Sequence, residues 1–411
     1  IVVLSAMSGT TNTLVEISDY LYKKNPEGAN EVINKLEAKY KQHIDELFST
    51  EEYKQKTLEF VKSVFDYIRS FTKDIFTLFE EKVILAQGEI ISTNMVTNYL
   101  CEQGVKAVLI PALEFMRTDK NSEPDLNYIR EKLALQLEAN PGQEIYITQG
   151  FICRNAYGEI DNLQRGGSDY TASLIGAAVN ASEIQIWTDI DGMHDNDPRV
   201  VDKTSPVRQL HFEEAAELAY FGAKILHPTC VQPAKYANIP VRLLNTIEPS
   251  APGTLISNET EKGKIKAVAA KDNITAIKIK SSRMLLAHGF LRKVFEIFES
   301  YQTPIDMVCT SEVGVSMSID NTKHLNEIVN DLKKYGTVTV DHDMCIVCVV
   351  GDLEWENVGF EAKALDAMRE IPVRMISFGG SNYNISFLIR ESDKKQALQS
   401  LSNVLFNGKE K

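Results

Sequence analysis

The sequence predicts an α/β protein in which a mostly parallel sheet carries helices on both faces and is followed by an α+β region. Two observations lead to this prediction. Up to Thr188, short apolar runs typical of strands alternate with amphipathic patterns typical of helices, which is the order of a parallel sheet with crossover helices. Beyond Gly263 the order changes to strand, helix, strand, strand, and this order occurs twice.

Composition places the chain among globular proteins and limits its partners. Of the 411 residues, 44% are hydrophobic and 25% are charged. The net charge of −13 argues against nucleic acid or an anionic membrane as the main partner. We see no apolar run of the roughly 18 residues that a transmembrane helix needs, and no signal peptide. We expect a cytoplasmic protein.

The cysteines predict no disulfide framework, because there are only six of them in 411 residues. Cys345-x-x-Cys348 has the spacing of a redox or zinc motif. It lies, however, in an apolar, strand-like run, and no second pair stands at zinc spacing. We therefore expect buried thiols, in keeping with a reducing compartment.

The first element, Ile1–Ser5, reads as a buried strand. It has no initiator methionine before it, so the sequence looks truncated. The small-residue loop Ser5–Asn12 follows and leads into a helical pattern from Leu14. Such a loop suits a ligand held by backbone N–H groups at a helix N-terminus. Plain N-capping is an equally good interpretation.

Helical patterns dominate the next stretch, residues 31–82. Apolar residues from Leu58 to Leu78 recur every three or four positions and predict one long helix that serves as scaffold. Gly88-Glu89 stands at the mouth of the next helix, Ile90–Leu100, where a glutamate is commonly a cap or first-turn acid. The remaining elements are predicted as strands at Val105–Ile110, Glu144–Thr148 and Glu183–Thr188, and helices at Asp125–Glu138 and Tyr170–Ala181.

Three polar or glycine-containing loops follow predicted strands, after Leu4, Thr148 and Thr188. In parallel sheets ligands lie outside the carboxyl ends of the strands. We therefore expect the ligand site at this edge. Pro249–Gly263 mixes proline, glycine, serine and charge, and it reads as a linker.

The C-terminal region contains a weak internal repeat of about 70 residues, which predicts paired α+β domains. In both copies a helix follows a Gly-Phe pair, and two strands follow the helix. The matching segments are Gly289-Phe290 and Gly359-Phe360, Ile305–Val308 and Val373–Ile376, and Val315–Met317 and Ile385–Phe387.

The run Gln164–Asp169 is the strongest local signal for chemistry. Its two adjacent glycines let the backbone approach an anion closely, and Ser168 and Asp169 open a helix whose N-terminus attracts anions. Arg165 offers a guanidinium fork to a carboxylate. The order matches neither a Walker A motif nor G-x-G-x-x-G. A structural turn is an equally good interpretation.

Two further signals suit a nucleotide. Thr188-Asp189 ends a strand and runs into a carboxylate-rich loop that reaches Arg199. This loop lacks the EF-hand pattern and its closing glutamate, so a nucleotide-facing loop with Arg199 directed at phosphates is favoured over calcium. Lys224 lies between a helix and a turn, where an ammonium can reach a phosphate, although a surface lysine is the alternative. Phosphoryl transfer needs positioned cations more than covalent chemistry.

Together these segments resemble the aspartate kinases, in order and spacing, and the C-terminal repeat resembles their tandem ACT domains. The segments that carry the resemblance are Ser5–Asn12, Gly88-Glu89, Gln149–Phe151, Gly166–Asp169, Trp187–Asp189, Asp197–Arg199 and Phe221–Pro228. The resemblance implies the amino-acid kinase fold over residues 1–257 and a regulatory region over residues 264–411. That region would hold two ferredoxin-like ACT domains, at about 274–343 and 344–411. The implied reaction converts ATP and L-aspartate to ADP and 4-phospho-L-aspartate, with ATP and Mg²⁺ as cofactors, on the route to lysine, threonine and methionine.

The resemblance also implies roles for single residues. Arg165, with Gly166 and Ser168 beside it, would hold the α-carboxylate of aspartate. Glu89 would bind the α-amino group, and Thr11 would help to place the substrate. Asp169 and Lys224 would be the catalytic residues, with Asp169 organising the reacting phosphate region. The nucleotide would contact Thr188, Asp189, Arg199, Lys224 and His194, the last of which stands where relatives often have tyrosine. No protein ligand set for a metal is implied.

The regulatory half is similar to that of lysine-sensitive members. Positions that line their inhibitor site match Met284, Phe290, Leu291, Ile305, Asp306, Ser311 and Glu312. Asp306 and Glu312 suit an ammonium, whereas Ala287 stands where such relatives often have serine. The alternative is that Met284, Phe290 and Leu291 are core and dimer contacts. The resemblance implies feedback inhibition by lysine, with threonine as the alternative inhibitor, and a homodimer or larger homo-oligomer through the ACT domains.

The family opens with a strand and a Lys-Phe-Gly-Gly loop, and this sequence lacks that segment. We expect the full protein to carry it, and residues 1–411 alone to show negligible turnover. A function from another class is also compatible with the sequence, a non-catalytic, amino-acid-sensing regulatory subunit of a kinase. A Lys-Phe-Gly-Gly segment encoded directly before Ile1 would favour the enzyme.

Overall fold

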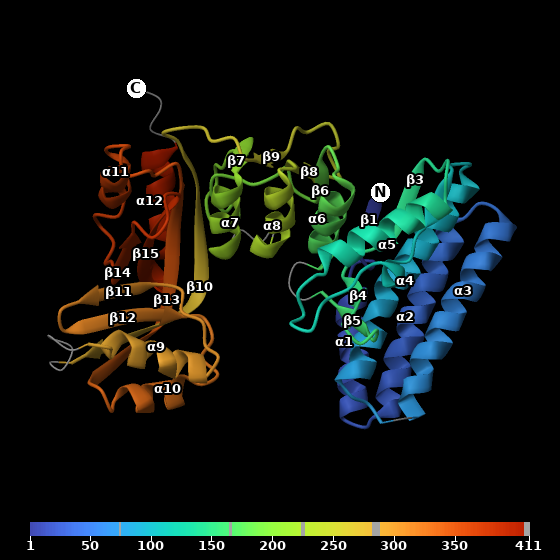
Figure 1. Ribbon diagram of the computed structural model, residues 1–411, viewed down its shortest axis with the longest axis horizontal. Helices are drawn as coiled ribbons and strands as arrows, with labels where there is room; N and C mark the ends of the chain where they lie inside the picture. Colours follow the sequence, from blue (N-terminus) through green and yellow to red (C-terminus); the bar gives the residue numbers. More distant parts are fainter. Residues whose placement is uncertain (74, 164–166, 223–226, 282–287, 407–411) are drawn as a thin grey trace. The chain divides into compact units, whose positions relative to one another are not determined.

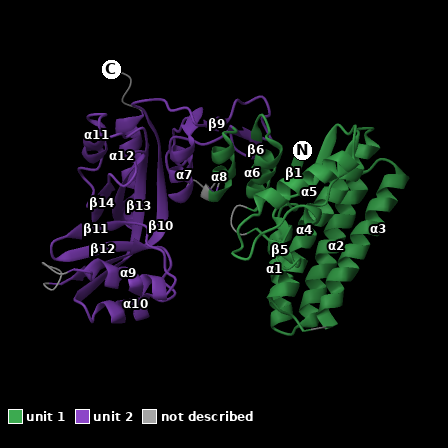
Figure 2. Ribbon diagram, viewed as in Figure 1, with its two compact units in different colours: residues 1–184, 229–239 green, residues 185–228, 240–411 purple. Residues whose placement is uncertain are grey.

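The computed structural model describes residues 1–73, 75–163, 167–222, 227–281 and 288–406 (Figure 1). The chain forms two compact units, which Figure 2 distinguishes by colour. Unit 1 comprises residues 1–184 and 229–239, and unit 2 comprises residues 185–228 and 240–411. None of the helices in the described segments is long and apolar enough to cross a membrane.

Unit 1 contains the parallel sheet that the sequence predicts. Its strands are β1 (Val2–Leu4), β3 (Ile145–Gln149) and β2 (Ala107–Leu109), in the order β1-β3-β2. Strand β1 is less buried than expected, with Val2 40% exposed, because β1 lies at the edge of this sheet. Helices α5 (Leu126–Ala139) and α6 (Gly167–Val179) confirm the two helices predicted around β3.

A helical bundle forms the rest of the core of unit 1 (Figure 1). Its members are α1 (Thr10–Tyr22), α2 (Pro26–Leu47), α3 (Glu51–Ser70) and α4 (Leu78–Glu102). The prediction of one long helix through Leu58–Leu78 is wrong, because α3 ends at Ser70 and a short 3₁₀ helix, Phe71–Lys73, follows it. Thr77 then starts α4 with a capping box to Glu80, and this start signal interrupts the apolar stripe.

Gly88-Glu89 does not stand at a helix mouth, as predicted, but in the interior of α4. Glycine weakens a helix interior, so a packing reason is expected there. A Cβ atom at Gly88 would lie 2.8 Å from the Cβ atom of Ala6, so the glycine lets α4 approach the loop after β1. Unit 1 is completed by the hairpin β4 (Ile152–Arg154) and β5 (Ile160–Asn162) and by α8 (Pro228–Ala237).

Unit 2 begins with a four-stranded sheet of order β6-β8-β9-β7. Its elements are β6 (Ile184–Thr188), β7 (Gln209–His211), β8 (Val241–Asn245) and β9 (Thr254–Ser257), with helix α7 (Phe212–Tyr220) after β7. β7 and β9 are parallel and β8 and β9 antiparallel, so this sheet is mixed. β6 confirms the strand predicted at Glu183–Thr188, is buried on one face only and leaves Trp187 45% exposed.

Strand β9 lies inside the stretch predicted as a linker, and that prediction is wrong. Gly253, with φ 65°, packs so closely on β8 that a Cβ atom there would lie 1.9 Å from the Leu243 carbonyl oxygen. The turn-forming residues before Thr254 therefore fold the chain back onto the sheet, and this tertiary pairing has no local sequence signal.

The C-terminal part of unit 2 confirms the repeated order of strand, helix, strand, strand. A six-stranded antiparallel sheet has the order β11-β12-β10-β13-β15-β14. The first copy is β10 (Ile265–Lys280), α9 (Phe290–Ser300), β11 (Val308–Ser311) and β12 (Gly314–Ile319), followed by α10 (Leu325–Leu332). The second copy is β13 (Thr337–Gly351), α11 (Phe360–Ala367), β14 (Met375–Phe378) and β15 (Asn384–Arg390), followed by α12 (Lys394–Leu405).

The long central strands β10 and β13 each extend through both copies. Residues 275–280 of β10 lie between β12 and residues 337–341 of β13, and residues 344–350 of β13 lie between β15 and residues 265–271 of β10. Each strand has a residue with positive φ, Asn273 at 60° and Asp343 at 54°, near shifts in the pairing register. Cys345 and Cys348 lie on β13 as fully buried free thiols, which confirms the sequence prediction for this pair.

Candidate active site

The loops after β1 and β3 lie side by side in unit 1, as the sequence predicts. Leu4 pairs with Gln149 at the ends of the two parallel strands. The next residue, Ser5, donates a hydrogen bond from its hydroxyl to Ser168 Oγ at 2.8 Å. The loop after Thr188 belongs to unit 2 and is described with that unit.

The N-terminus of α1 carries no side-chain cap, so the structure does not support plain N-capping there. Its first residue follows Gly9, whose φ of 81° turns the chain into the helix. Thr10 and Tyr40 share a buried hydrogen bond of 2.9 Å between their hydroxyl groups, which fixes the start of α1 against α2. Thr11, predicted to help place the substrate, lies half-buried in this first turn.

Glu89 is the most unusual carboxylate in unit 1. Its residue is 3% exposed, Oε1 accepts a hydrogen bond of 3.3 Å from the Ala6 N–H, and Oε2 is buried without a hydrogen-bond partner. Burial raises the pKa of this carboxyl to about 7. An unpaired buried oxygen beside the ligand-facing loop is suited to receive a cationic group.

A hydrogen-bond network that sequence reasoning missed fixes the backbone around Glu89. Ser92 Oγ donates to the Ser5 carbonyl at 2.7 Å, and Thr93 Oγ1 donates to the Glu89 carbonyl at 2.7 Å. Gln149 on β3 donates to Thr93 Oγ1 at 2.9 Å. The available signal was the spacing, since Ser92 and Thr93 lie three and four residues after Glu89 on one helix face.

The glycines around Ser168 permit close packing of the β3 loop on α6. A Cβ atom at Gly150 would lie 2.4 Å from Ser168 Oγ and 2.8 Å from Ser168 Cα. A Cβ atom at Gly167 would lie 2.6 Å from Phe151 Cδ2. The Phe151 N–H donates to Thr171 Oγ1 at 3.0 Å, although Phe151 has a φ of 68°.

Asp169 stands in the first turn of α6 with a half-buried side chain. Burial raises its pKa to about 6. Within the described segments its carboxylate has no hydrogen-bond or ion-pair partner, so it is available to a ligand or a ligand-bound ion. Arg165 and Gly166, the other predicted members of this run, lie outside the described residues.

Replacing Gly150 with alanine tests whether this close packing positions Ser168. The new Cβ atom meets backbone as well as side-chain atoms of Ser168, so the start of α6 must shift. We expect kcat/KM of the kinase reaction that the resemblance implies to fall at least about tenfold, because misplacement of about 1 Å can cost a hundredfold. Gly380→Ala is the matched control, since Gly380 has open space around it and no positive φ. Equal kinetics for both variants would contradict the positioning role.

In unit 2, four of the five residues predicted to bind the nucleotide line one cavity of about 500 Å³. They are Thr188, Asp189, His194 and Arg199. Val268, Ala269 and Leu398 supply part of its apolar lining. Lys224, the fifth predicted residue, lies outside the described segments. The sequence thus predicted a group that the fold does bring together.

The loop that supplies these residues is held by its own carboxylates. Asp191 binds Arg208 through two hydrogen bonds of 3.0 and 2.9 Å and accepts the Gly253 N–H at 3.1 Å. His194 Nδ1 and Thr204 Oγ1 are 2.8 Å apart. The Arg199 guanidinium forms a fork on Asp197, at 2.9 and 2.8 Å, so a phosphate would have to compete with Asp197 for it.

The predicted inhibitor residues separate toward two ends of the first repeat. Phe290 begins α9 and is 8% exposed, Leu291 is 38% exposed, and Ser311 and Glu312 close the hairpin at the same end. Met284 lies outside the described residues. Ile305 and Asp306 precede β11, at the opposite end.

Asp306 is engaged by a cluster that sequence reasoning missed. Its Oδ1 accepts hydrogen bonds from Lys271 Nζ on β10 and from the Tyr220 hydroxyl of α7, both at 2.8 Å. The carboxylate thus already pairs with an ammonium of its own chain.

Comparisons with known proteins agree with the fold in both halves. A model of the amino acid kinase family matches residues 1–245, and a model of an ACT domain matches residues 347–405. The chain is 32% identical to lysine-sensitive aspartokinase 3 of Escherichia coli (strain K12) over 418 residues, which cover 99% of this chain and 92% of that protein.

Two solved structures of E. coli aspartokinase III are also similar. The complex with aspartate and ADP (R-state) has a TM-score of 0.84 at 32% identity, covering 98% of this chain and 92% of that chain. The complex with lysine and aspartate (T-state) has a TM-score of 0.76 at 31% identity with the same coverage.

Proposed function

The chain belongs to the aspartokinases of the amino acid kinase family, and on that premise we propose that it phosphorylates the side-chain carboxylate of L-aspartate with ATP. The products are ADP and 4-phospho-L-aspartate. The observation that carries the proposal is the buried Glu89 carboxylate, whose unpaired Oε2 lies beside the loop after β1. The α-ammonium of an amino-acid substrate is the cation that such an oxygen needs.

The amino acid is held by groups at the ends of β1 and β3. Glu89 receives the α-ammonium, and Arg165 takes the α-carboxylate with Gly166 and Ser168 beside it. Thr11 lies at the uncapped start of α1, where backbone N–H groups favour a negatively charged ligand. Holding the acceptor in this way supplies the positioning on which phosphoryl transfer depends.

The nucleotide is held by Thr188, Asp189, His194 and Arg199, which line the cavity of unit 2, and by Lys224. ATP is used as its Mg²⁺ complex, because the ion neutralises charge on the phosphates and needs few protein carboxylates. Asp169 suits the reacting phosphate region, since its half-buried carboxylate has no partner in the described part of the chain. Lys224 and Asp169 are the catalytic residues of this proposal.

Residues 1–257 form the catalytic domain, and residues 264–411 form two ACT domains that regulate it. Lysine inhibits the enzyme by binding unequally to its two states. The complex of E. coli aspartokinase III with lysine and aspartate supports lysine over threonine. Exposed apolar residues of α9, Leu291 and Phe295, each 38% exposed, suit a homodimer through this region.

A coupled assay of ADP release tests the proposal with the complete gene product, ATP and a panel of acceptors. We expect activity with L-aspartate and none with L-glutamate, carbamate or UMP, and inhibition on adding lysine. Activity with another acceptor in place of aspartate would overturn the assigned substrate. Inhibition by threonine but not lysine would overturn the assigned inhibitor alone.

The raised pKa of Glu89 predicts how aspartate use depends on pH. Above about pH 7 the carboxylate is ionised and attracts the α-ammonium, whereas below that value it takes up a proton and loses this charge. We expect kcat/KM for aspartate to fall as pH drops through about 7, approaching tenfold per unit. Initial rates measured between about pH 5.5 and 8.5 give this fall in kcat/KM on the acid side of the profile. A profile that stays flat across this range would contradict the assigned role.

A further inference from the structure

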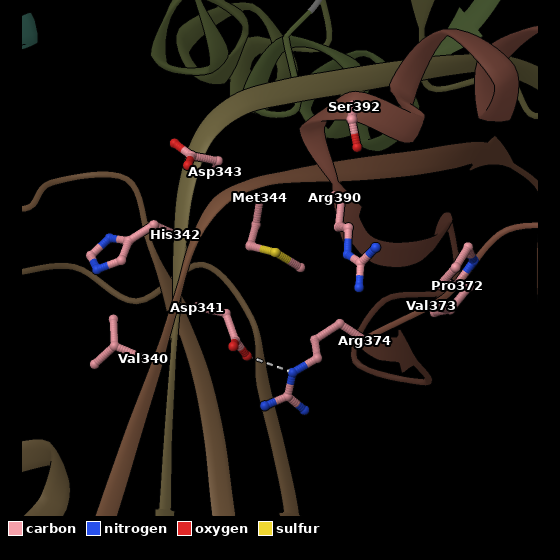
Figure 3. Close-up of a pocket in the computed structure, with 10 residues that line it drawn as sticks. All are labelled: Val340, Asp341, His342, Asp343, Met344, Pro372, Val373, Arg374, Arg390 and Ser392. Carbon is pink, nitrogen blue, oxygen red and sulfur yellow. Dashed lines mark hydrogen bonds and ion pairs between the residues drawn. The ribbon is translucent and has the colours of Figure 1, made fainter.

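A cavity of about 620 Å³ opens in the second repeat, and none of the residues that line it has been given a role above (Figure 3). It is lined by the middle of β13, residues 340–344, by the chain just before β14, and by the end of β15 with the residues after it. Its polar lining includes Asp341, His342, Asp343, Arg374 and Arg390, and its apolar lining includes Val340, Met344, Pro372 and Val373. This volume is in the range of small-molecule sites.

The internal repeat supplies the comparison by which this cavity can be interpreted. Lys271 on β10 corresponds to Asp341 on β13, because each lies two residues before the positive-φ residue of its strand. Asp306 corresponds to Arg374, because their backbone N–H groups make equivalent hydrogen bonds. The Asp306 N–H donates to the Ser318 carbonyl on β12 at 2.8 Å, and the Arg374 N–H donates to the Leu388 carbonyl on β15 at 2.7 Å. Asp320 and Arg390 stand at the ends of these last two strands.

The two sets of corresponding residues, Lys271, Asp306 and Asp320 in the first copy and Asp341, Arg374 and Arg390 in the second, carry opposite charges. In the first copy one ammonium meets two carboxylates, with Lys271 Nζ 2.8 Å from Asp306 and 2.9 Å from Asp320. In the second copy one carboxylate, Asp341, meets Arg374 at 2.7 Å, and Arg390 lies in the same cavity. In the first copy a side chain from α7 also contacts this set. The Tyr220 hydroxyl donates to Asp306, and the centre of the Tyr220 ring lies 4.3 Å from Lys271 Nζ.

In the second copy no aromatic side chain of the described residues makes the corresponding contact with Asp341, Arg374 or Arg390. Arg374 uses Nε for Asp341, and its two terminal nitrogens make no hydrogen bond in the described segments. The Arg390 guanidinium has neither a hydrogen bond nor an ion pair there. Figure 3 shows the Arg390 side chain extending into the space beside Met344, while Arg374 bends toward Asp341 and the Asp343 carboxylate points away from both arginines. One guanidinium is therefore left without a negative partner.

We propose that this cavity is a binding site for a small carboxylic acid with an apolar body. The carboxylate pairs with the fork of the unpartnered Arg390 guanidinium, and Arg374 adds a second positive charge to the same cavity. Met344, which is 4% exposed, lies with Val340 and Val373 along the apolar wall. The site is independent of the kinase reaction, since none of its residues belongs to the proposed aspartate, nucleotide or lysine sites.

Isothermal titration of the full chain with 4-methylpentanoate tests the proposal, with acetate, 4-methylpentanamide and inorganic phosphate as comparisons. We expect 4-methylpentanoate to bind with a Kd of about 1 mM, acetate more weakly, and the neutral amide not at all. Tighter binding of phosphate than of 4-methylpentanoate would overturn the assignment to carboxylates. Absence of carboxylate binding would overturn the site itself.

Variants then locate the binding. Arg390→Gln should weaken 4-methylpentanoate binding about tenfold or more, because it removes a charged hydrogen bond. The fold should tolerate it, since this side chain is exposed and makes neither a hydrogen bond nor an ion pair within the described segments. Asp341→Asn should tighten binding, because it removes a negative charge from the cavity while its amide oxygen can still accept the Arg374 Nε–H. Arg369→Gln is the matched control, an exposed arginine that pairs with Asp366 and does not line the cavity.

Unchanged affinity in Arg390→Gln would overturn the proposal by placing the ligand elsewhere. Sedimentation of the same variants separates a free acid from a carboxylate side chain of a second copy. If Arg390→Gln dissociated an oligomer, the occupant would be an acidic residue of another chain, and the free-ligand site would be refuted.

Discussion

Replacing Glu89 with glutamine should raise the KM for L-aspartate by about 10- to 100-fold, the range expected when one hydrogen bond to a charged group is lost. Glutamine keeps the size of the side chain and the acceptor for the Ala6 N–H, but it offers no negative charge to the α-ammonium. If the ammonium contact is equal in the ground and transition states, kcat changes little and the loss appears in KM. Initial rates at varied aspartate and saturating ATP separate the two parameters.

The pH profile and the stability of this variant distinguish a binding role from a structural one. Glu89→Gln should lose the fall in kcat/KM below about pH 7, because that limb reports Glu89. A carboxyl whose folded-state pKa is raised stabilises the fold below its unfolded pKa, and this contribution is lost as pH rises through about 7. The variant should therefore unfold no more easily than the parent at pH 8.

Glu81→Gln is the matched control on the same helix, since Glu81 binds the exposed Tyr22 hydroxyl and faces no ligand. It should leave KM and the pH profile unchanged. A Glu89→Gln enzyme with the parental KM and the same acid limb would rule out the contact with the ammonium. A variant that unfolds readily at pH 8 would instead make Glu89 a structural residue.

The sequence predicted the parallel strands of unit 1 and the repeat of unit 2 well, because both depend on local patterns. Apolar runs mark β1, β2 and β3, and the Gly-Phe pairs before α9 and α11 mark the start of each repeat helix. The ends of parallel strands meet at one edge by geometry alone, so the neighbours of Leu4 and Gln149 were also predictable.

Boundaries that depend on competing signals were predicted less well. Gly88 suggested a helix end, yet it lies inside α4 because Ala6 packs against it from a distant segment. The apolar stripe through Leu58–Leu78 concealed the capping box of Thr77 and Glu80, which separates α3 from α4. Turn-forming residues around Gly253 likewise concealed β9, whose partners lie elsewhere in the chain.

The same distinction between local patterns and contacts of distant segments applies to the candidate site. Thr188, Asp189, His194 and Arg199 come from one loop, so their shared cavity in unit 2 follows from sequence proximity. The burial and unpaired oxygen of Glu89 depend on Ala6, which is 83 residues away in sequence. The contacts of Asp306 with Lys271 and Tyr220 span 35 and 86 residues and have no local signal. The roles of all these residues remain predictions, and Arg165, Gly166, Lys224 and Met284 also lie outside the described residues.

The cluster around Lys271 should contribute strongly to the stability of unit 2, and Lys271→Met tests this contribution. The ammonium lies between Asp306 and Asp320, and the Asp306 side chain is only 3% exposed. Burial acts to lower the pKa of Lys271, but hydrogen bonds to the two aspartates outweigh it and raise the pKa, so the lysine is charged. Methionine keeps most of the volume while leaving the two carboxylates without their cation.

We expect Lys271→Met to lower the free energy of unfolding of unit 2 by about 3–5 kcal/mol, the usual result of breaking a buried ion pair from one side. Both tryptophans of the chain, Trp187 and Trp355, lie in unit 2. Urea unfolding followed by tryptophan fluorescence therefore reports on that unit. Lys264→Met provides the control, because Lys264 and Glu261 form a pair with side chains 57% and 34% exposed. Such a pair contributes about 1 kcal/mol or less.

A double-mutant cycle assigns the loss to the ion pair rather than to packing. Asp306→Asn added to Lys271→Met removes one of the stranded carboxylates, so the double variant should recover at least about 1 kcal/mol relative to Lys271→Met. The Tyr220 hydroxyl can still donate to the oxygen of the new amide, so α7 keeps its contact with the strand that follows Asp306. If instead the losses of the two single variants simply add, Lys271 and Asp306 act independently. The cluster would then not hold α7 to β10 through charge.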